Sequence, residues 1–135
     1  MKRFLDSNVF LYAFLNQDVG KKAVAARILA EAVREDNGYV SLQVAKEFCN
    51  VMIKRSGKPV DEIAKASEIL DRYHLVDGSM RLIRRALEFK GRYDIQFYDS
   101  LMLAAAEAGG CGEIYTEDLN DGQVYFGIKA VNPFR

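Results

Sequence analysis

The stretch FYDSLMLAAAEAGGCGEIYTED, residues 97–118, runs from an alanine-rich segment through a glycine pair into a short apolar strand. The alanine-rich segment is apolar on nearly every side, which predicts a helix inside the protein. The glycine pair predicts the end of that helix, and the residues after it have the pattern of a buried strand. Asp99 stands at the start of the predicted helix, and Asp118 lies just beyond the predicted strand. A buried helix that leads directly into a strand is typical of α/β proteins.

The same alternation of strands and helices extends over the rest of the chain. Hydrophobic spacing and capping residues predict helices at residues 21–35, 43–57, 58–73 and 79–91, the last capped by Ser79 and stopped by Gly91. Short strands are predicted to end near Asp6 and to lie within residues 39–42, 74–78, 111–118 and 128–134. This order predicts a three-layer α/β/α sandwich with a mainly parallel central sheet. A length of 135 residues predicts one domain over 1–135.

The composition of the chain argues against several classes of protein. Nineteen basic residues balance nineteen acidic ones, which removes the argument for nucleic-acid binding from a globally basic chain. One histidine and two separated cysteines are too few for a zinc site, and reduced cysteines suit the cytoplasm. The apolar N-terminal stretch is interrupted by Asp6 and Asn8, so a buried strand is expected there instead of a signal peptide. No run is long enough for a membrane span.

Four acids are predicted to meet at one edge of the sheet. In open parallel sheets, ligands bind beyond the carboxyl ends of the strands. Asp6 follows the first strand directly, and Asp118 follows a later strand. Glu47 borders the inward face of its amphipathic helix, and Asp99 begins the buried helix. We therefore expect carboxylates from four distant segments to converge.

Such a convergence indicates a metal site. Carboxylates a few ångströms apart raise one another's pKa, and burial adds to the cost of ionising them. A divalent cation offsets both effects, and oxygen ligands without histidine or cysteine suit Mg²⁺ or Mn²⁺. The chemistry that matches this ligand set is metal-assisted hydrolysis of a phosphodiester bond.

Each acid taken alone also has a structural interpretation. Asp6 suits a turn at the end of a strand, and Asp99 suits a helix cap. Glu47 fits a solvated position beside the core, and Asp118 and Asp121 fit ordinary turns. The individual residues are compatible with either role.

Four segments in their order along the chain resemble the PIN-domain family, in particular the VapC-type toxins of toxin–antitoxin modules. The segments are FLDSNVFLYAF (4–14), SLQVAKEFCNVM (41–52), FYDSLMLAAAEAGGCGEIYTEDL (97–119) and VNPF (131–134). The resemblance implies a PIN-like fold and a Mg²⁺- or Mn²⁺-dependent endoribonuclease. It also implies two partners, a cognate antitoxin protein and a second copy of the chain in a homodimer, with RNA as substrate.

The resemblance also selects the acids. Its four catalytic and metal-binding positions fall on Asp6, Glu47, Asp99 and Asp118. It favours Asp99 over the nearby Asp94, for which capping is the simpler role. Gln96 departs from the family pattern, in which serine or threonine commonly caps this helix.

Three further residues are expected around the acids. By resemblance, Asn8 is a polar residue that supports the site, and Thr116 supplies a hydroxyl that helps to hold it, near phosphate. Asp121 precedes Gly122, which favours a turn, although contact with a water on the metal would also suit this position. Glu117 has no counterpart among the four acids and is expected to point away into solvent.

Different functions fit parts of the pattern. An aspartate-phosphorylating phosphatase or receiver would use the strand-end Asp6, but DSNV lacks the second acid of a D-x-D motif and no clear partner lysine follows a late strand. The sequence is also compatible with a PIN-like RNA-processing nuclease outside a toxin–antitoxin module, and with a binding module whose acids are structural. Basic residues that could contact RNA phosphates are Lys46, Lys54, Arg55, Arg81, Arg84, Arg85, Lys90 and Arg92.

Overall fold

The computed structural model of the chain describes all 135 residues and has one six-stranded sheet at its centre. The strands lie in the order β3-β2-β1-β4-β6-β5. Their bounds are β1 Arg3–Leu5, β2 Gly38–Ser41, β3 His74–Val76, β4 Glu113–Tyr115, β5 Val124–Tyr125 and β6 Ile128–Val131. All neighbouring strands pair in parallel except β5, which runs antiparallel to β6. The mainly parallel sheet predicted from the sequence is confirmed.

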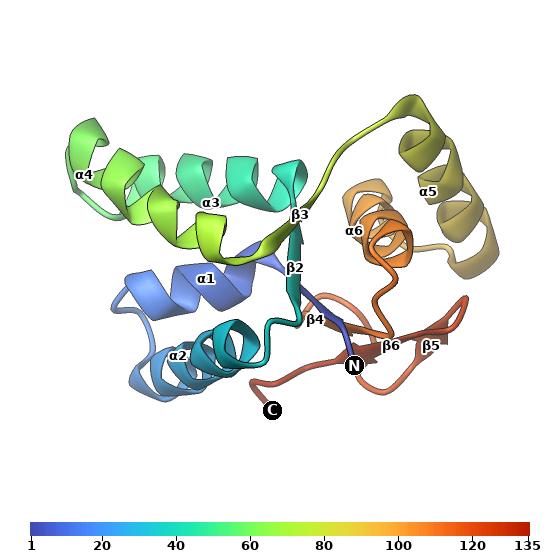
Figure 1. Cartoon of the computed structure of the whole chain (residues 1–135), viewed down its shortest axis with the longest axis horizontal. Coiled ribbons are helices and arrows are strands. Elements are labelled where there is room, and N and C mark those ends of the chain that lie inside the picture. Colours follow the sequence, from blue (N-terminus) through green and yellow to red (C-terminus); the bar gives the residue numbers. More distant parts are fainter.

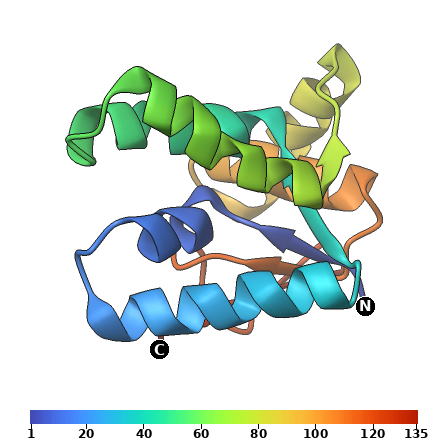
Figure 2. The ribbon, with the colours of Figure 1, turned by 60° about the vertical axis from the view of Figure 1, so that its left-hand side comes forward.

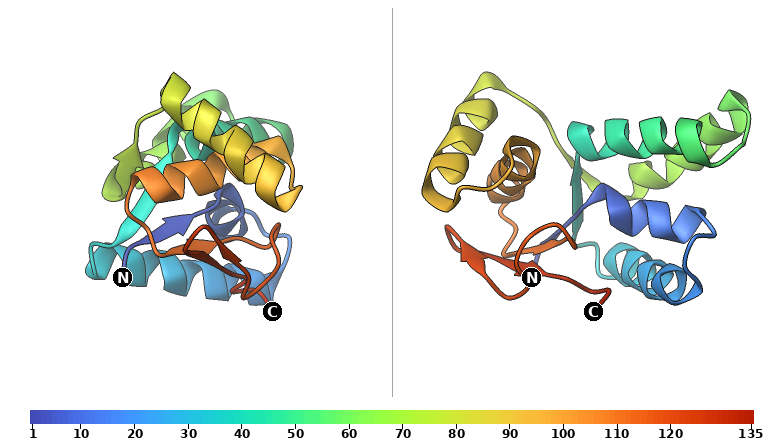
Figure 3. Two further views of the ribbon diagram at one scale, coloured as in Figure 1. Left: turned by 90° about the vertical axis from the view of Figure 1, so that its right-hand side faces the viewer. Right: turned by 180° about the vertical axis from the view of Figure 1, so that it is seen from behind.

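Helices cover both faces of the sheet. They are α1 Ser7–Phe14, α2 Val19–Arg34, α3 Leu42–Arg55, α4 Val60–Ala66, the 3-10 helix η1 Ser67–Arg72, α5 Met80–Tyr93 and α6 Phe97–Ala108. In Figure 1, β2 stands edge-on between α1–α4 on one side and α5 with α6 on the other. Figure 2 shows α2 running along the outside of its layer, and Figure 3 shows α5 outside α6. The three-layer α/β/α sandwich is therefore confirmed. No helix combines the length and apolar character needed to cross a bilayer.

Side-chain caps determine where several helices begin. Asp6, Asp18, Ser41 and Ser79 each accept a hydrogen bond from a backbone N–H of the first turn of α1, α2, α3 and α5, respectively. Such caps satisfy amide groups that have no partner inside the helix. The capping role expected for Ser79 is confirmed. Asp6 follows the end of β1 and also caps the start of α1.

Helix α5 continues past the stop expected at Gly91 and ends at Tyr93. The ring of Tyr93 packs against Tyr125 and Phe126, with centroid separations of 4.9 and 5.2 Å. This packing offsets the cost of about 1 kcal/mol that a glycine imposes on a helix interior. The helix stops instead at Asp94, whose φ of 50° lies in the left-handed region.

Two other parts of the chain differ from the expected elements. The helix expected over residues 58–73 divides into α4 and the tighter η1, at a point where the Ser67 hydroxyl donates to the Ala64 carbonyl, 2.6 Å away. Hydroxyls that bond back to the preceding turn compete with the helical ladder. The sequence also gave no indication of β5, a two-residue strand joined to β6 through Phe126 and Gly127, both with positive φ. A strand this short has no periodicity to detect.

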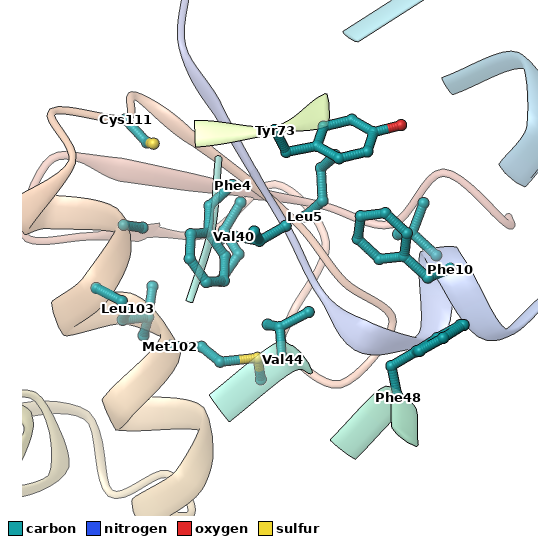
Figure 4. Close-up of a cluster of buried hydrophobic side chains, with 14 of the residues drawn as sticks. Phe4, Leu5, Phe10, Val40, Val44, Phe48, Tyr73, Met102, Leu103 and Cys111 are labelled. Carbon is teal, nitrogen blue, oxygen red and sulfur yellow. The ribbon is translucent and has the colours of Figure 1, made fainter. Parts of the chain in front are cut away.

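The core lies on both sides of the sheet and holds α6 in place. Figure 4 shows side chains from the strands, such as Phe4 and Val40, between Phe48 of α3 on one side and Leu103 of α6 on the other. Every residue of α6 from Met102 to Ala106 is buried, as its all-round apolar character predicts. Burying a large apolar side chain contributes about 2 kcal/mol, so the position of the first turn of α6 is fixed by many contacts behind it.

Candidate metal-dependent active site

Asp6 lies at the carboxyl end of the central strand β1, where the sheet order reverses between β2 and β4. Such a switch point leaves a crevice for ligands between the segments that diverge from it. The Asp6 side chain is only 1 % exposed, and its Oδ1 accepts a 2.6 Å hydrogen bond from the Ser7 N–H. Its own N–H donates to the Tyr115 carbonyl at the end of β4, 3.1 Å away. Asp6 is therefore fixed by its neighbours in both α1 and β4.

Thr116 connects Asp6 to the loop that carries Asp118. The buried Thr116 hydroxyl donates to Asp6 Oδ2 at 2.7 Å. The same hydroxyl oxygen accepts from the Asp118 N–H at 3.1 Å. One side chain thus holds a carboxylate at the end of β1 and the backbone of a second acidic residue after β4.

Glu47 reaches the same edge from the second turn of α3. The Ser7 hydroxyl oxygen lies 3.2 Å from Asp6 Oδ1 and 3.2 Å from Glu47 Oε2, so its single proton is shared between two carboxylates. Gln43, one turn before Glu47, donates to Glu47 Oε1 at 2.8 Å and to the Tyr98 carbonyl at 3.0 Å. Gln43 therefore joins α3 to the first turn of α6, next to Asp99.

Asp99 and Asp118 face an open pocket beside the buried Asp6. Asp99 is half-buried in the first turn of α6, and Asp118 is exposed. Both line a pocket of about 450 Å³, together with Asp94, Ile95 and Gln96. Asp6 does not line this pocket, and Glu47 lines a separate one.

The acids influence one another's ionisation. Burial raises the pKa of Asp6 to about 7, with further raising by the charges of Asp118 and Glu47 and opposing effects of the Thr116 and Ser7 hydrogen bonds. Burial raises the pKa of Asp99 to about 6, and the charges of Asp118 and Glu47 add to the rise. Asp118 and Glu47 therefore influence both Asp6 and Asp99, although the four acids come from the end of β1, from α3, from α6 and from the loop after β4.

The donor chemistry of this group fits a hard divalent ion. Carboxylate oxygens without histidine or cysteine are the ligands that Mg²⁺ and Mn²⁺ prefer. Burial and the neighbouring carboxylates raise the pKa values of Asp6 and Asp99, and a bound cation would oppose both effects. The chain contains no group of three or more acidic, histidine or cysteine side chains already placed to hold one ion in common. Mg²⁺ commonly takes one or two carboxylates and keeps several waters, and the open pocket leaves room for them.

The remaining expected residues take different places. Asn8 lies half-buried in the first turn of α1, two residues after Asp6. Asp121 directs its carboxylate to the C-terminal segment: Oδ1 accepts from the Asn132 N–H at 2.8 Å, and Oδ2 lies 3.6 Å from Arg135 Nη1. Asp94 ends α5 and pairs with Lys90, 3.0 Å away.

The expectation that Glu117 is solvated was wrong. Its side chain is 21 % exposed, and its Oε2 lies 3.2 Å from the Lys21 ammonium. Its Oε1 accepts a hydrogen bond from the Tyr12 hydroxyl. These partners belong to α1 and α2 and lie far from Glu117 in sequence, so local pattern gave no indication of them.

Sequence reasoning also missed Ser7 and Gln43. Gln43 stands four residues before Glu47, a spacing that places two side chains on the same face of a helix and that could have identified it. Ser7 follows Asp6 directly, but its contact with Glu47 depends on the packing of α1 against α3 and could not be read from spacing.

Comparisons with known proteins agree with this fold. The family model described as PIN domain matches residues 3–126. The structure is similar to the VapC20 toxin of Mycobacterium tuberculosis, described as cleaving the sarcin-ricin loop, with a TM-score of 0.71, 20 % identity and coverage of 87 % of this chain and 90 % of that one. It is also similar to a chain of a toxin–antitoxin complex from Klebsiella pneumoniae, with a TM-score of 0.73, 18 % identity and 98 % coverage of both chains.

A third similar structure is VapBC2 from Rickettsia felis bound to a DNA fragment from its promoter, with a TM-score of 0.72, 17 % identity and coverage of 96 % and 97 %. At these identities the similarity concerns the fold. A search of curated proteins found no match.

Proposed function

Because the chain belongs to the PIN-domain family, we propose that it is a metal-dependent endoribonuclease whose catalytic acids are Asp6, Glu47, Asp99 and Asp118. The observation that carries this proposal is that the charges of Asp118 and Glu47 act both on the buried, hydrogen-bonded Asp6 and on Asp99. Only a positively charged ligand makes that arrangement favourable when all four acids are ionised.

In the proposed hydrolysis, different residues of the chain have different roles. When bound, Mg²⁺ or Mn²⁺ would acidify a water molecule and neutralise charge on the phosphate. Asp6, Asp99 and Asp118 would hold the ion, and hydrogen bonds from Thr116 and Ser7 fix the direction of the Asp6 carboxylate. Glu47 completes the ligand set or orients the attacking water, and Gln43 restrains its carboxylate.

The basic residues that could contact RNA fall into two groups, those already paired with an acid and those that are not. Arg85 is paired with Glu107, 2.8 Å away, and Lys90 with Asp94, 3.0 Å away, so neither has its full charge available for phosphate. Lys46, in contrast, lines a pocket of about 820 Å³ that also includes Glu47 and Tyr98. We assign to Lys46 a phosphate contact beside the catalytic acids, which predicts a salt-dependent affinity for RNA.

We further propose that the chain is the toxin of a toxin–antitoxin pair and acts as a homodimer. One of the similar structures is described as a toxin–antitoxin complex, and another as VapBC2 bound to DNA from its promoter. Exposed apolar side chains lie at the start of α3 and along α5 and α6: Leu42, Met80, Ile83, Leu87 and Tyr98. All of these except Leu87 line one pocket, and a cluster of exposed apolar side chains commonly marks a protein interface.

The test of the nuclease proposal begins with calorimetric titration of Mn²⁺ into the wild-type chain and into Asp6→Asn and Asp99→Asn. We expect binding to weaken in both variants while thermal stability without metal is retained. The same proteins are then incubated with an RNA pool and Mn²⁺. Cleavage by the wild type together with its loss in Asp6→Asn supports the proposal and excludes a contaminating nuclease. If the wild type binds no Mn²⁺ and cuts no RNA, the proposal is withdrawn.

The toxin role has a separate test. Induced expression of the wild type should arrest growth, Asp6→Asn should not, and co-expression of the neighbouring reading frame should restore growth. Cleavage of RNA in vitro without growth arrest would favour a PIN nuclease of RNA processing. Mn²⁺ binding without cleavage of any RNA would favour a non-catalytic binding module.

A further inference from the structure

Tyr12, Lys21 and Glu117 form a polar cluster, here called the Glu117 anchor, behind the loop that carries Asp118. The Lys21 ammonium donates to the Tyr12 hydroxyl at 3.2 Å and to Glu117 Oε2 at 3.2 Å. The Tyr12 hydroxyl donates in turn to Glu117 Oε1. Each member therefore contacts both of the others, and both oxygens of the Glu117 carboxylate are engaged.

Aromatic rings enclose this cluster. The Phe134 ring packs edge-on against Tyr12 with a centroid separation of 4.8 Å. The Lys21 ammonium lies 4.7 Å from the centroid of the Tyr12 ring and 5.9 Å from that of Phe134. Partial removal from water strengthens an ion pair relative to one at an open surface. The Glu117 side chain is accordingly held by contacts to α1 and α2, and Phe134 of the C-terminal segment packs against both of its partners.

The Glu117 anchor and Thr116 both restrain the short segment from Thr116 to Asp118, through different partners. The Thr116 hydroxyl accepts from the Asp118 N–H and donates to Asp6, while Glu117 extends to Tyr12 and Lys21. Asp118 lines the pocket that it shares with Asp99, and Glu117 does not. Two neighbouring side chains thus leave the loop toward different surroundings, and Glu117 is fixed by its contacts with Tyr12 and Lys21.

We propose that the Glu117 anchor positions Asp118, so that Tyr12, Lys21 and Glu117 are positioning residues of the site although none lines the carboxylate pocket. With Glu117 fixed, rotation of the loop that would turn Asp118 away from Asp99 breaks the contacts of the anchor. The inference rests on the proposed nuclease function for its catalytic consequence. Its effect on the loop does not depend on any ligand.

The first experiment therefore uses the full chain without metal. Hydrogen exchange at the Asp118 amide, followed by NMR, reports how often the loop opens. We expect exchange about 10-fold faster in Glu117→Gln and Lys21→Met than in the wild type. The matched control is Lys22→Met, which removes the neighbouring lysine of α2, whose ammonium pairs with Asn16 at 2.6 Å, and should leave Asp118 exchange unchanged.

The second experiment measures function with the same proteins. Residues that orient metal ligands typically alter metal affinity or activity by about 10- to 100-fold when removed. We expect Lys21→Met and Glu117→Gln to weaken Mn²⁺ binding by about 10-fold and to lower kcat by a similar factor, with KM within about 2-fold of the wild type. If Lys21 and Glu117 only stabilised the fold, the variants would have a lower melting temperature but would not show a decrease in kcat at nearly constant KM.

Conservative variants complete the test. Lys21→Arg keeps a cation that can donate to both partners and should restore Mn²⁺ affinity and kcat to within about 3-fold of the wild type. Tyr12→Phe keeps the ring that packs on Phe134 and removes the two hydrogen bonds of the Tyr12 hydroxyl, but it leaves the Lys21–Glu117 ion pair in place. We therefore expect it to remain folded and to show a smaller change in the same direction. These variants keep the inference testable if Glu117→Gln fails to fold.

The outcomes separate the inference from the function on which it rests. Unchanged Asp118 exchange in Glu117→Gln and Lys21→Met overturns the inference, whatever the nuclease data show. Faster exchange with wild-type Mn²⁺ affinity and kcat also overturns it, because the loop then moves without consequence for the site. If even the wild type neither binds Mn²⁺ nor cuts RNA, the proposed function and the catalytic half of the inference fail, while faster exchange still establishes the anchor's hold on the loop.

Discussion

Thr116 Oγ1 donates a 2.7 Å hydrogen bond to Asp6 Oδ2, joining residues that lie 110 positions apart in the chain. The same oxygen accepts the Asp118 N–H, so one buried hydroxyl lies between two proposed metal ligands. A hydroxyl can serve both neighbours at once because it has one proton to donate and lone pairs to accept with. This dual role gives the site a fixed point that neither acid provides alone.

Replacing Thr116 by valine should disable the site while preserving side-chain shape. Valine leaves Asp6 Oδ2 and the Asp118 N–H without their partner, and an unpaired buried polar group costs about 1–3 kcal/mol. We expect RNA cleavage to fall by about 10- to 100-fold and Mn²⁺ binding to weaken. Single-turnover cleavage and calorimetry measure the two effects. Thr116→Ser, which keeps the hydroxyl, should retain most of the activity; equal losses in both variants would show that the methyl group matters more than the hydrogen bonds.

The two aspartates of the loop after β4 should behave differently. Asp118→Asn removes a charge that faces the carboxylate pocket, so activity should fall by at least about 100-fold with little change in stability. Asp121→Asn weakens contacts with Asn132 and Arg135, so its main effect should be a loss of about 1 kcal/mol in the free energy of unfolding. Chemical denaturation and cleavage rates on both variants provide the comparison. A larger activity loss for Asp121→Asn would place Asp121 at the metal.

The raised pKa of Asp6 predicts how stability depends on pH without metal. The Asp6 carboxyl has a pKa of about 7 in the folded chain against 3.8 as its ordinary value. The folded state therefore holds its proton more tightly than the unfolded state, and the free energy of unfolding should decrease as pH rises from about 4 to about 7, by on the order of a few kcal/mol. Melting temperatures in a chelating buffer between pH 5 and pH 8 measure the slope.

Asp6→Asn is the control for that slope. Asparagine still caps α1 but cannot ionise, so the variant should lose most of the decrease and keep only the part that Asp99 contributes through its pKa of about 6. Saturating Mn²⁺ should reverse the slope of the wild type, because metal binds the ionised acids. A wild-type melting temperature that rises with pH in the absence of metal would mean that Asp6 is already ionised at pH 5.

Gln43 should contribute to catalysis through Glu47. Gln43→Met keeps the length of the side chain and removes the donor that bonds Glu47 Oε1 and the Tyr98 carbonyl. We expect kcat to decrease by about 10-fold, with a change in melting temperature of only a few degrees because Gln43 is partly exposed. The matched control is Gln17→Met, an exposed glutamine in the turn between α1 and α2. Equal kcat in Gln43→Met and wild type would leave Glu47 to be oriented by Ser7 alone.

The sequence predicted the sheet type and the layers, and it placed Asp6 and Asp118 after strands and Asp99 at a helix start, because these features depend on local pattern. Asp6 and Asp118 follow apolar strands, and parallel strands bring their carboxyl ends to one edge. The start of α6 was predicted from apolar residues that are indeed buried. Where the acids stand could therefore be anticipated from neighbours within a few residues along the chain.

The environment of Glu117 could not be predicted in the same way. Its partners Tyr12 and Lys21 belong to helices about 100 residues earlier, and their approach depends on how α1 and α2 pack on the loop. The position of Glu117 in a turn predicted an exposed side chain, but packing against distant helices determines its actual exposure. The extension of α5 to Tyr93 has the same origin, since contacts with Tyr125 and Phe126 outweigh the local signal of a glycine.

The distance along the chain between Asp6 and Thr116 also determines when the site can exist. Strand β1 is synthesised first, but its central place in the sheet is complete only after β4 pairs with it, and contacts of this separation form late and slowly in folding. A nascent chain on the ribosome that has not yet released β4 lacks both Thr116 and Asp118. The proposed catalytic acids can therefore come together only after translation has passed Asp118, and RNA cleavage that needs all four of them cannot begin earlier.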